Sequence, residues 1–175
     1  WDAIDKQRLV PFAYYGIADS TDLRNVPWRR GRGYDANALS QLLTADDAWA
    51  RMVIDQLVRR VDCINEIRAF GFCVSVSHAQ FMARVFNEHG IASVSVSGET
   101  SHEDRVNALR QLTNRELKVI FSVDLFNEGI DLPGVDTLLM LRPTESPTLF
   151  LQQLGRGLRR HEGKSLCTEI GRAHV

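Results

Sequence analysis

From about residue 71 to residue 141, short apolar runs alternate with amphipathic segments, and this alternation limits the fold more than any other feature. The runs at 72–76, 91–96, 119–123 and 137–141 have the length and near-continuous apolar character of buried strands. Helical spacing of apolar residues predicts helices over 79–89 and 103–112, the second starting where Thr100 and Glu103 stand in capping-box order. Strands that alternate with helices of this length form βαβ units. We therefore predict a three-layer α/β/α domain with a mostly parallel sheet.

The predicted strand ends identify the edge of the sheet where function is expected. In an open parallel sheet, ligands bind beyond the carboxyl ends of the strands. Those ends are followed here by four short segments, residues 77–78, 97–100, 124–131 and 142–146. We expect all four to line one edge.

Small polar residues occupy two of these segments, namely Ser77, Ser97, Gly98 and Thr100. Turns of this composition before a helix present free backbone amides and hydroxyls, which bind phosphate oxygens. Helix capping alone explains the same residues equally well. His78 has no neighbours that would make it catalytic, so we expect a structural role.

A predicted segment from about residue 147 to residue 160 carries the pattern Q-x-x-G-R-x-x-R at Gln152, Gly155, Arg156 and Arg159. Helical residues three apart lie on nearly the same face, so both arginines point into one space. Paired guanidiniums suit an oxyanion because each offers planar, permanently charged donors. The alternative is an arginine-rich surface helix with no role in binding.

Two ordered motifs make the chain resemble a known family. A strand, a D-x-x-x-x-G-x-D loop from Asp124 to Asp131, a second strand and the Q-x-x-G-R-x-x-R pattern resemble motifs V and VI of superfamily 2 helicases, the DEAD/DEAH-type motors. The wording FSVDLFNEGIDLP is most similar to a bacterial group related to restriction-enzyme motor subunits. The resemblance covers roughly residues 71–168 and implies the second, C-terminal RecA-like lobe of such a motor.

The resemblance also implies a role for each matching residue. Arg156 and Arg159 would reach ATP held by the first lobe of the same polypeptide, which would also hold Mg²⁺. Gln152 would help to position the phosphates, and Gly155 would let the helix backbone approach closely.

Other matching residues would touch the ribose or the nucleic acid. Gly129 and Asp131 would shape the motif V loop and contact the ribose; the alternative for Asp131 is a carboxylate that caps a turn. The turns at Ser77 and at 97–100 would grip a DNA or RNA backbone. Val123 stands at the motif V threonine position, where Ser122 is a possible substitute for the hydroxyl.

The sequence lacks the other half of an ATP site. It contains no D-E-x-D/H box, and Gly163-Lys164-Ser165 lacks the upstream glycine and following helix of a P-loop. We therefore expect residues 1–168 alone not to hydrolyse ATP. Two other readings remain: an inactive RecA-like scaffold, and an α/β enzyme acting on a phosphorylated small molecule.

The remaining segments suggest a domain organisation. Residues 1–34 are predicted to be an inter-lobe linker or the end of a preceding lobe, with a basic patch at Arg24, Arg29, Arg30 and Arg32. Residues 35–70 are expected to be helical, with a long helix from Thr44 to about Ala69. Residues 169–175, EIGRAHV, match the translation of a common sequencing adapter and are expected to lie outside the fold.

Composition narrows the functional classes. The net charge is −1, so nucleic-acid binding must rest on a local patch rather than on the field of the whole molecule. Three unpaired cysteines suggest buried thiols in a reducing, cytoplasmic setting. No 18-residue apolar run is present, so we expect no membrane partner.

Overall fold

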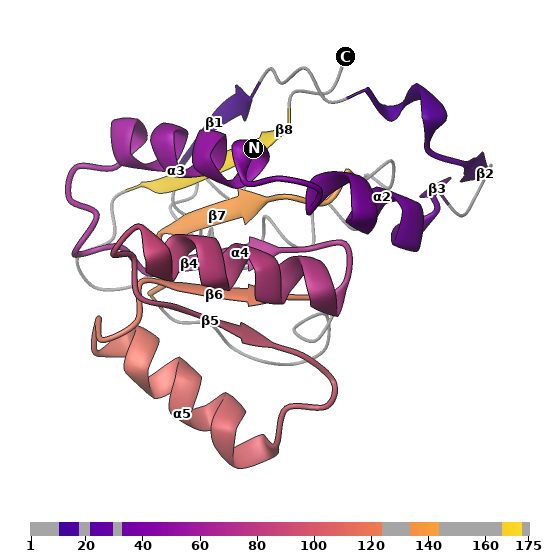
Figure 1. The fold of residues 1–175 in the computed structure, drawn as a ribbon. Helices are drawn as coiled ribbons and strands as arrows, with labels where there is room; N and C mark the ends of the chain where they lie inside the picture. The colour runs from indigo at the N-terminus through magenta and orange to yellow at the C-terminus, as the bar shows by residue number, and fades with distance from the viewer. Residues whose placement is uncertain (1–10, 18–21, 30–32, 124–133, 144–165, 173–175) are drawn as a thin grey trace.

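A six-stranded parallel sheet forms the centre of the computed structural model, which describes residues 11–17, 22–29, 33–123, 134–143 and 166–172 (Figure 1). The strand order is β1-β8-β7-β4-β6-β5, and every neighbouring pair is parallel. The strands are β1 (Phe12–Ile17), β4 (Ala69–Phe72), β5 (Ser93–Val96), β6 (Val119–Ser122), β7 (Thr137–Met140) and β8 (Cys167–Arg172). The predicted α/β fold with a mostly parallel sheet is confirmed.

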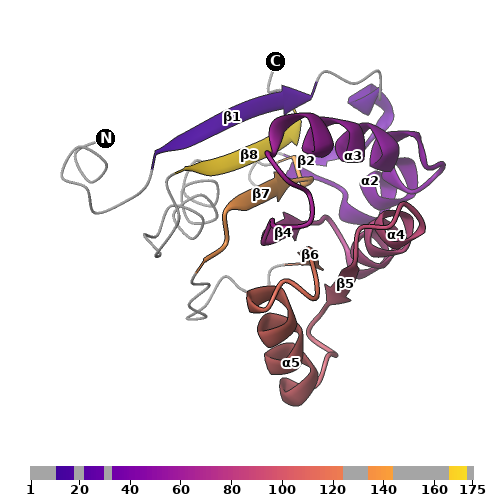
Figure 2. The same ribbon diagram turned by 90° about the vertical axis from the view of Figure 1, so that its left-hand side faces the viewer.

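Helices cover both faces of the sheet. On one face lie α2 (Ala36–Leu43), α3 (Ala48–Arg60) and α4 (Val76–Glu88), and their buried side chains pack with Phe121 and Ile170 (Figure 2). Residues of α5 (His102–Thr113) pack with the other set of strand side chains, including Phe70 and Ile120. Since successive strand residues point to opposite faces, neighbours such as Ile120 and Phe121 belong to different cores.

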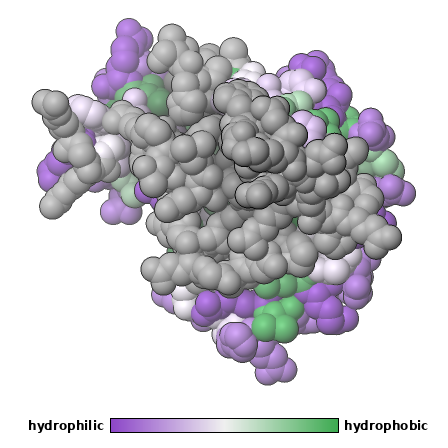
Figure 3. All heavy atoms as spheres, turned by 180° about the vertical axis from the view of Figure 1, so that it is seen from behind, coloured by the Kyte–Doolittle hydropathy of each residue, from purple (hydrophilic) through white to green (hydrophobic). Residues whose placement is uncertain are grey.

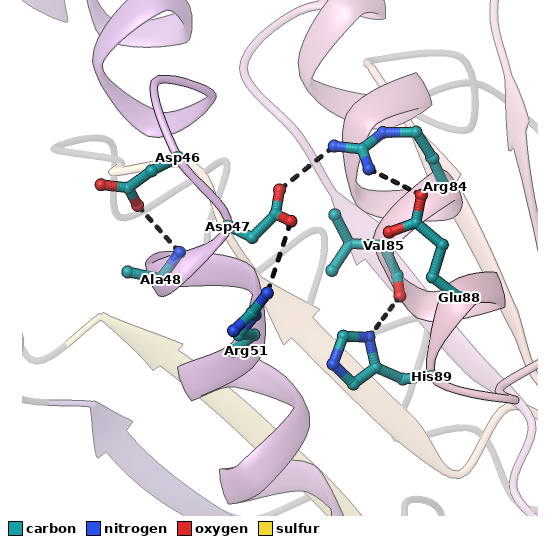
Figure 4. Close-up of polar contacts among 8 residues, drawn as sticks. All are labelled: Asp46, Asp47, Ala48, Arg51, Arg84, Val85, Glu88 and His89. Atoms are coloured by element: carbon teal, nitrogen blue, oxygen red, sulfur yellow. Dashed lines mark hydrogen bonds and ion pairs between the residues drawn. The ribbon is translucent and has the colours of Figure 1, made fainter.

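Charged contacts join α3 to α4 at the surface (Figure 4). Asp47 accepts a hydrogen bond from Arg84 Nη2 at 3.1 Å and lies 3.8 Å from Arg51. Arg84 also binds Glu88 at 2.8 Å within α4. Exposed ion pairs of this kind contribute only about 0–1 kcal/mol each, so the apolar contacts beneath them stabilise the helix pair.

The first predicted βα unit is displaced by about one turn. The strand predicted at 72–76 is β4 at Ala69–Phe72, and α4 starts at Val76 rather than residue 79. Ser75 Oγ accepts a hydrogen bond from the His78 amide at 3.0 Å, which fixes the start of the helix. The apolar run is longer than the strand, so hydrophobicity alone misplaced the boundary.

The long helix predicted from Thr44 to about Ala69 is present but shorter at both ends, as α3 over Ala48–Arg60. Thr44 is the C-cap of α2, and its hydroxyl donates to the Ser40 carbonyl at 2.8 Å, whereas α3 ends at Arg60 because Val61 is extended. At α5, Ser101 rather than Thr100 is the N-cap, with its Oγ accepting from the Asp104 amide at 3.1 Å. Neither predicted threonine therefore caps the helix that follows it: the N-cap of α3 is Asp47, and that of α5 is the neighbouring Ser101.

Both outer segments join the sheet. β1, expected in a linker, pairs along its length with β8, and β8 also pairs with β7. The structure therefore places residues 169–172 inside the sheet, although the sequence suggested that they lie outside the fold. The side chains of Cys167 and Ile170 are fully buried, and this apolar burial stabilises the position of β8 in the sheet.

In the view from behind, hydrophobic areas are small and separated by hydrophilic ones wherever residues are described (Figure 3). Cys73 and Cys167 are buried as expected, but Cys63, in the segment between α3 and β4, is exposed. Within the described residues, no helix has the length and apolar character needed to cross a membrane.

Candidate functional site

The carboxyl ends of four central strands lie at one level. Phe72 of β4 pairs in register with Ser122 of β6 and with Met140 of β7, and Ser122 pairs with Val96 of β5. The starts of α4 and α5 follow β4 and β5 at this edge, on the side to which the strand arrows point in Figure 1. The expected convergence of the first two turns is therefore present.

Three hydroxyls meet at the start of α4. Ser40 Oγ lies 2.6 Å from Ser75 Oγ and 3.1 Å from Ser77 Oγ, and the Ser75 and Ser77 hydroxyls are 3.0 Å apart. Ser77 is exposed, whereas Ser40 is buried. The amides of Val76 and Ser77 lie in the first helical turn, where no intrahelical acceptor exists. Free amides and the positive end of the helix dipole make this turn suitable for an anion.

Ser40 was missed by sequence reasoning. It lies on α2, 35 residues before Ser75, and its local pattern is that of an ordinary amphipathic helix. Only the packing of α2 against α4 reveals its contribution. Through these contacts, Ser40 orients the hydroxyls of Ser75 and Ser77.

His78 lies beneath the same turn and is fully buried. Its Nδ1 accepts a hydrogen bond from the Val74 amide at 3.3 Å, so the neutral ring bridges the end of β4 and α4. Burial lowers the pKa of His78 from 6.5 to about 4. The ring is a neutral part of the scaffold at neutral pH, in agreement with a structural role.

The second turn, after β5, is organised by Thr100. Its Oγ1 accepts from the Ser97 amide at 2.9 Å, and its amide donates to the Ser97 carbonyl at 3.1 Å. Arg105 Nε braces the turn by donating to the Thr100 carbonyl at 3.0 Å. Gly98 is exposed, and a Cβ built on it would meet no atom within 4 Å. The Ser97–Gly98 backbone is thus open to a ligand.

Acidic side chains make the two turns unequal. Glu99, Glu103 and Asp104 lie at or just before the first turn of α5, and the Ser101 hydroxyl already donates to Asp104 at 2.7 Å. Carboxylates repel a phosphate, and α4 has no acidic residue in its first turn. The start of α4 is therefore the better anion site, with the Ser97–Gly98 backbone as a second contact.

The other predicted residues divide into two groups. Ser122 is only 1% exposed and its hydroxyl has no hydrogen-bond partner in the described part of the chain, so its placement does not support direct contact with nucleic acid. The remaining predicted residues, Gln152, Gly155, Arg156, Arg159, Gly129 and Asp131, lie outside the described residues. Among the described residues, no cluster of histidine, cysteine and acidic side chains is arranged to hold a metal ion.

Comparisons with known proteins identify the family. The helicase conserved C-terminal domain matches residues 50–161, well over half of the chain. IRC3 of Saccharomyces cerevisiae, named as an ATP-dependent helicase, is 36% identical over 96 residues, covering 55% of this chain and 14% of that protein. A 51.5 kDa protein of a Lactococcus phage is 31% identical over 163 residues, covering 93% of this chain and 34% of that protein. The chain thus spans a third or less of the length of these relatives.

Solved structures show the same fold. The DNA-bound type ISP restriction-modification enzyme LlaBIII aligns with a TM-score of 0.65 at 20% identity, over 97% of this chain and 12% of that one. The Escherichia coli DEAD-box protein SrmB aligns with a TM-score of 0.58 at 23% identity, over 71% and 73% of the two chains. The family match covers more than half of the chain, and the solved neighbours share its α/β fold. The chain belongs to the helicase conserved C-terminal domain family and has a RecA-like fold.

Proposed function

We propose that this chain is the second motor lobe of an ATP-driven nucleic-acid helicase or translocase and that it grips one strand by its phosphates. The observation that carries the proposal is the start of α4, where Ser77 and two unpaired helical amides face the carboxyl edge of the sheet. The Ser97–Gly98 backbone adds a second contact on the same edge. Two such contacts hold a sugar-phosphate backbone without reading its bases.

The family relation supports DNA or RNA as the bound polymer. Relatives include the RNA helicase CshB of Staphylococcus aureus, and the structural neighbour LlaBIII is bound to DNA. Contacts to phosphates suit either polymer.

For ATP hydrolysis, we assign Arg156 and Arg159 to the γ-phosphate of ATP bound by a first lobe, which would hold Mg²⁺. Phosphoryl transfer requires stabilisation of negative charge on the transferred group, and an arginine from outside the phosphate-binding loop supplies it. Gln152, Gly155, Gly129 and Asp131 would complete the nucleotide contacts on this side of the cleft.

Binding to single strands tests the phosphate grip. The purified chain should bind dye-labelled oligo-dT of about 16 nucleotides weakly, with little dependence on sequence. The logarithm of the association constant should fall steeply with the logarithm of salt concentration, by about 0.7 for each phosphate neutralised. Fluorescence anisotropy across a salt series measures both quantities. Binding that hardly responds to salt would contradict a phosphate grip.

ATPase rates test the arginine assignment in a two-lobe protein in which this chain follows a first helicase lobe. Replacing an arginine that acts on the transition state lowers turnover by roughly 10³-fold or more. Arg156→Lys keeps the charge but loses the planar fork, so it should stay strongly impaired while nucleotide affinity changes little. Arg160→Ala is the matched control, since on a helix it would point away from the other two arginines. If Arg156→Lys and Arg160→Ala lowered turnover equally, the arginines would act only as a basic surface and not on the transition state.

An inactive scaffold is the competing function. It predicts salt-dependent strand binding with no contribution from Arg156 or Arg159 to any ATPase activity. The two experiments together separate the readings, because strand binding alone is common to both.

A further inference from the structure

A short β-hairpin stands beside the phosphate-binding edge and has no part in the function proposed above. β2 (Trp28–Arg29) and β3 (Gly33–Tyr34) pair in antiparallel fashion, with Trp28 opposite Tyr34 and Arg29 opposite Gly33. Its base is closed by the Asp35 amide, which donates to the Pro27 carbonyl at 2.7 Å. In Figure 1 the hairpin lies on the side to which the central strands point.

The hairpin is fixed to the α4 turn through α2. Asp35 caps α2 by accepting from the Ala38 amide at 2.9 Å, and Ser40 of α2 contacts both Ser75 and Ser77. Ser40 is four residues from the start of α2, about 6 Å along the helix axis. Nucleotides advance about 3.4 Å per step along each strand of a duplex. The hairpin therefore lies only a few nucleotides from Ser77.

Its exposed side chains combine an aromatic ring with a positive charge. Trp28 is 47% exposed, whereas its partner Tyr34 packs against the core and anchors the hairpin. Arg29 is exposed and has no ion pair with any described residue, unlike Arg24, which binds both carboxylate oxygens of Asp22 at 2.9 Å.

We propose that this hairpin is a further contact for the bound strand, beyond the two turns, with Trp28 stacking on a base and Arg29 pairing with a phosphate. The inference rests on the proposed function, because it extends the same strand beyond Ser77. Exposed aromatic rings and arginines are the two elements that hold single strands without sequence preference. Arg29 places a positive charge without a described ion-pair partner beside the exposed ring of Trp28, so the hairpin favours a polyanion over a protein surface of mixed sign.

The test uses the full 175-residue chain and dye-labelled oligo-dT, with four variants compared across a salt series. Trp28→Ala should weaken binding about 5-fold or more, the usual effect of losing one stacked base, and Trp28→Phe should restore most of it. Arg29→Ala should weaken binding and lower the salt dependence by about 0.7 in the log–log slope. The matched control, Arg59→Ala, removes an exposed arginine at the far end of α3, away from this edge, and should change neither quantity (Figure 1).

Tryptophan fluorescence gives a readout that a structural role would not move. Trp49 is only 5% exposed, so it reports little on a ligand at the surface. With Trp1 replaced by phenylalanine as background, oligo-dT should quench the emission, and Trp28→Phe should abolish most of that quenching. Circular dichroism melting of each variant checks that the fold is intact.

The outcomes separate this inference from the function on which it rests. If the wild-type chain binds no strand in a salt-dependent way, both fall. If the wild-type chain binds but the Trp28 and Arg29 variants bind as tightly as Arg59→Ala, only the hairpin contact is overturned. Weaker binding by Trp28→Ala, rescue by Trp28→Phe and a lowered slope for Arg29→Ala support it.

Discussion

Two glycines at the same sheet show how differently the interior and the carboxyl edge are determined. Gly71 lies in the middle of β4, where a Cβ would enter the ring of Phe121. Gly98 lies after β5, where a Cβ would meet nothing within 4 Å. The first glycine is required by the protein itself. The second has no such requirement from the described residues, which leaves room for a ligand as its reason.

Gly71→Ala should have the largest effect on stability. Phe121 is fully buried and packs edge-on against Phe86, with ring centroids 4.9 Å apart, so it has little room to yield. Overpacking of this kind costs about 1–3 kcal/mol, and each kcal/mol lowers Tm by about 2–4 °C in a chain of this length. Thermal melting followed by circular dichroism measures the loss.

A compensating substitution sharpens the test. Gly71→Ala combined with Phe121→Leu should lose less than the sum of the two single losses, because the smaller side chain releases the clash. Strictly additive losses would show that the ring of Phe121 does not explain the need for Gly71.

His78 lies where the interior meets the carboxyl edge, since it is buried directly beneath the α4 turn. Its folded pKa of about 4 lies below the unfolded value of 6.5, so protonation favours the unfolded chain. The contribution of His78 is full above pH 6.5, declines as the pH falls and is lost below about pH 4. The loss amounts to roughly 1–3 kcal/mol.

His78→Asn isolates this contribution, because the amide oxygen keeps an acceptor for the Val74 amide and does not titrate. Urea unfolding at pH 7 and pH 5 should show that the variant loses less stability on acidification than the wild-type chain. Equal losses in the two proteins would mean that His78 is not the buried neutral group described here.

Glu169 is an exception to the contrast between the apolar interior and the polar edge, because it is an acidic residue buried inside the sheet. Its carboxylate is fully buried in β8 beside Tyr14 of β1, and neither oxygen has a hydrogen-bond partner among the described residues. Burial raises the pKa of Glu169 from 4.5 to about 7, and the pKa of Tyr14 is raised by burial and by the nearby Glu169. Because the folded chain holds the proton more tightly, this stabilisation is present below pH 4.5 and is lost as the pH rises through about 7.

Glu169→Gln should therefore raise Tm at pH 8, by an amount equivalent to about 1 kcal/mol, and have little effect at pH 5. Glu66→Gln, at an exposed glutamate before β4, is the control and should change Tm little at either pH. A fall in Tm at pH 8 for Glu169→Gln would show that the carboxylate has a partner.

Local patterns predicted much of the central fold from the sequence. The strands at 119–122 and 137–140 and the helix α5 were placed within a residue or two, because short continuous apolar runs and helical spacing are local signals. The first and last strands of the chain, β1 and β8, were not predicted as part of the sheet. β1 and β8 lie at opposite ends of the chain and pair only in the folded molecule, and no local pattern encodes that pairing.

The candidate site was predicted in the same uneven way. Ser77, Ser97, Gly98 and Thr100 follow from the rule that parallel strands end at one edge, and the structure places them there. Ser40 and the burial of Ser122 depend on side-chain packing between distant segments, which sequence position does not reveal. The acidic residues at the start of α5 can be read from the sequence. That they make α5 a poorer phosphate site than α4 became clear only when the structure placed the start of α4, which has no acidic residue, at the same edge.

Gly98→Ala should have the smallest effect on the fold and the most specific effect on binding. Its side chain would enter open space, and Gly98 does not have the positive φ that strains other residues, so Tm should stay within about 1–2 °C of the wild-type value. A backbone that approaches a phosphate closely has no room for a methyl group, so oligo-dT binding should weaken about 2- to 5-fold, a cost of about 0.5–1 kcal/mol.

Gly90→Ala gives the opposite pattern and serves as the matched control. Gly90 also has open space around it, but its φ of +77° is unfavourable for alanine, so Tm should fall while strand binding at a temperature well below the transition stays unchanged. If Gly98→Ala binds oligo-dT as tightly as the wild-type chain, the strand does not approach this turn. The phosphate grip would then rest on the start of α4 alone.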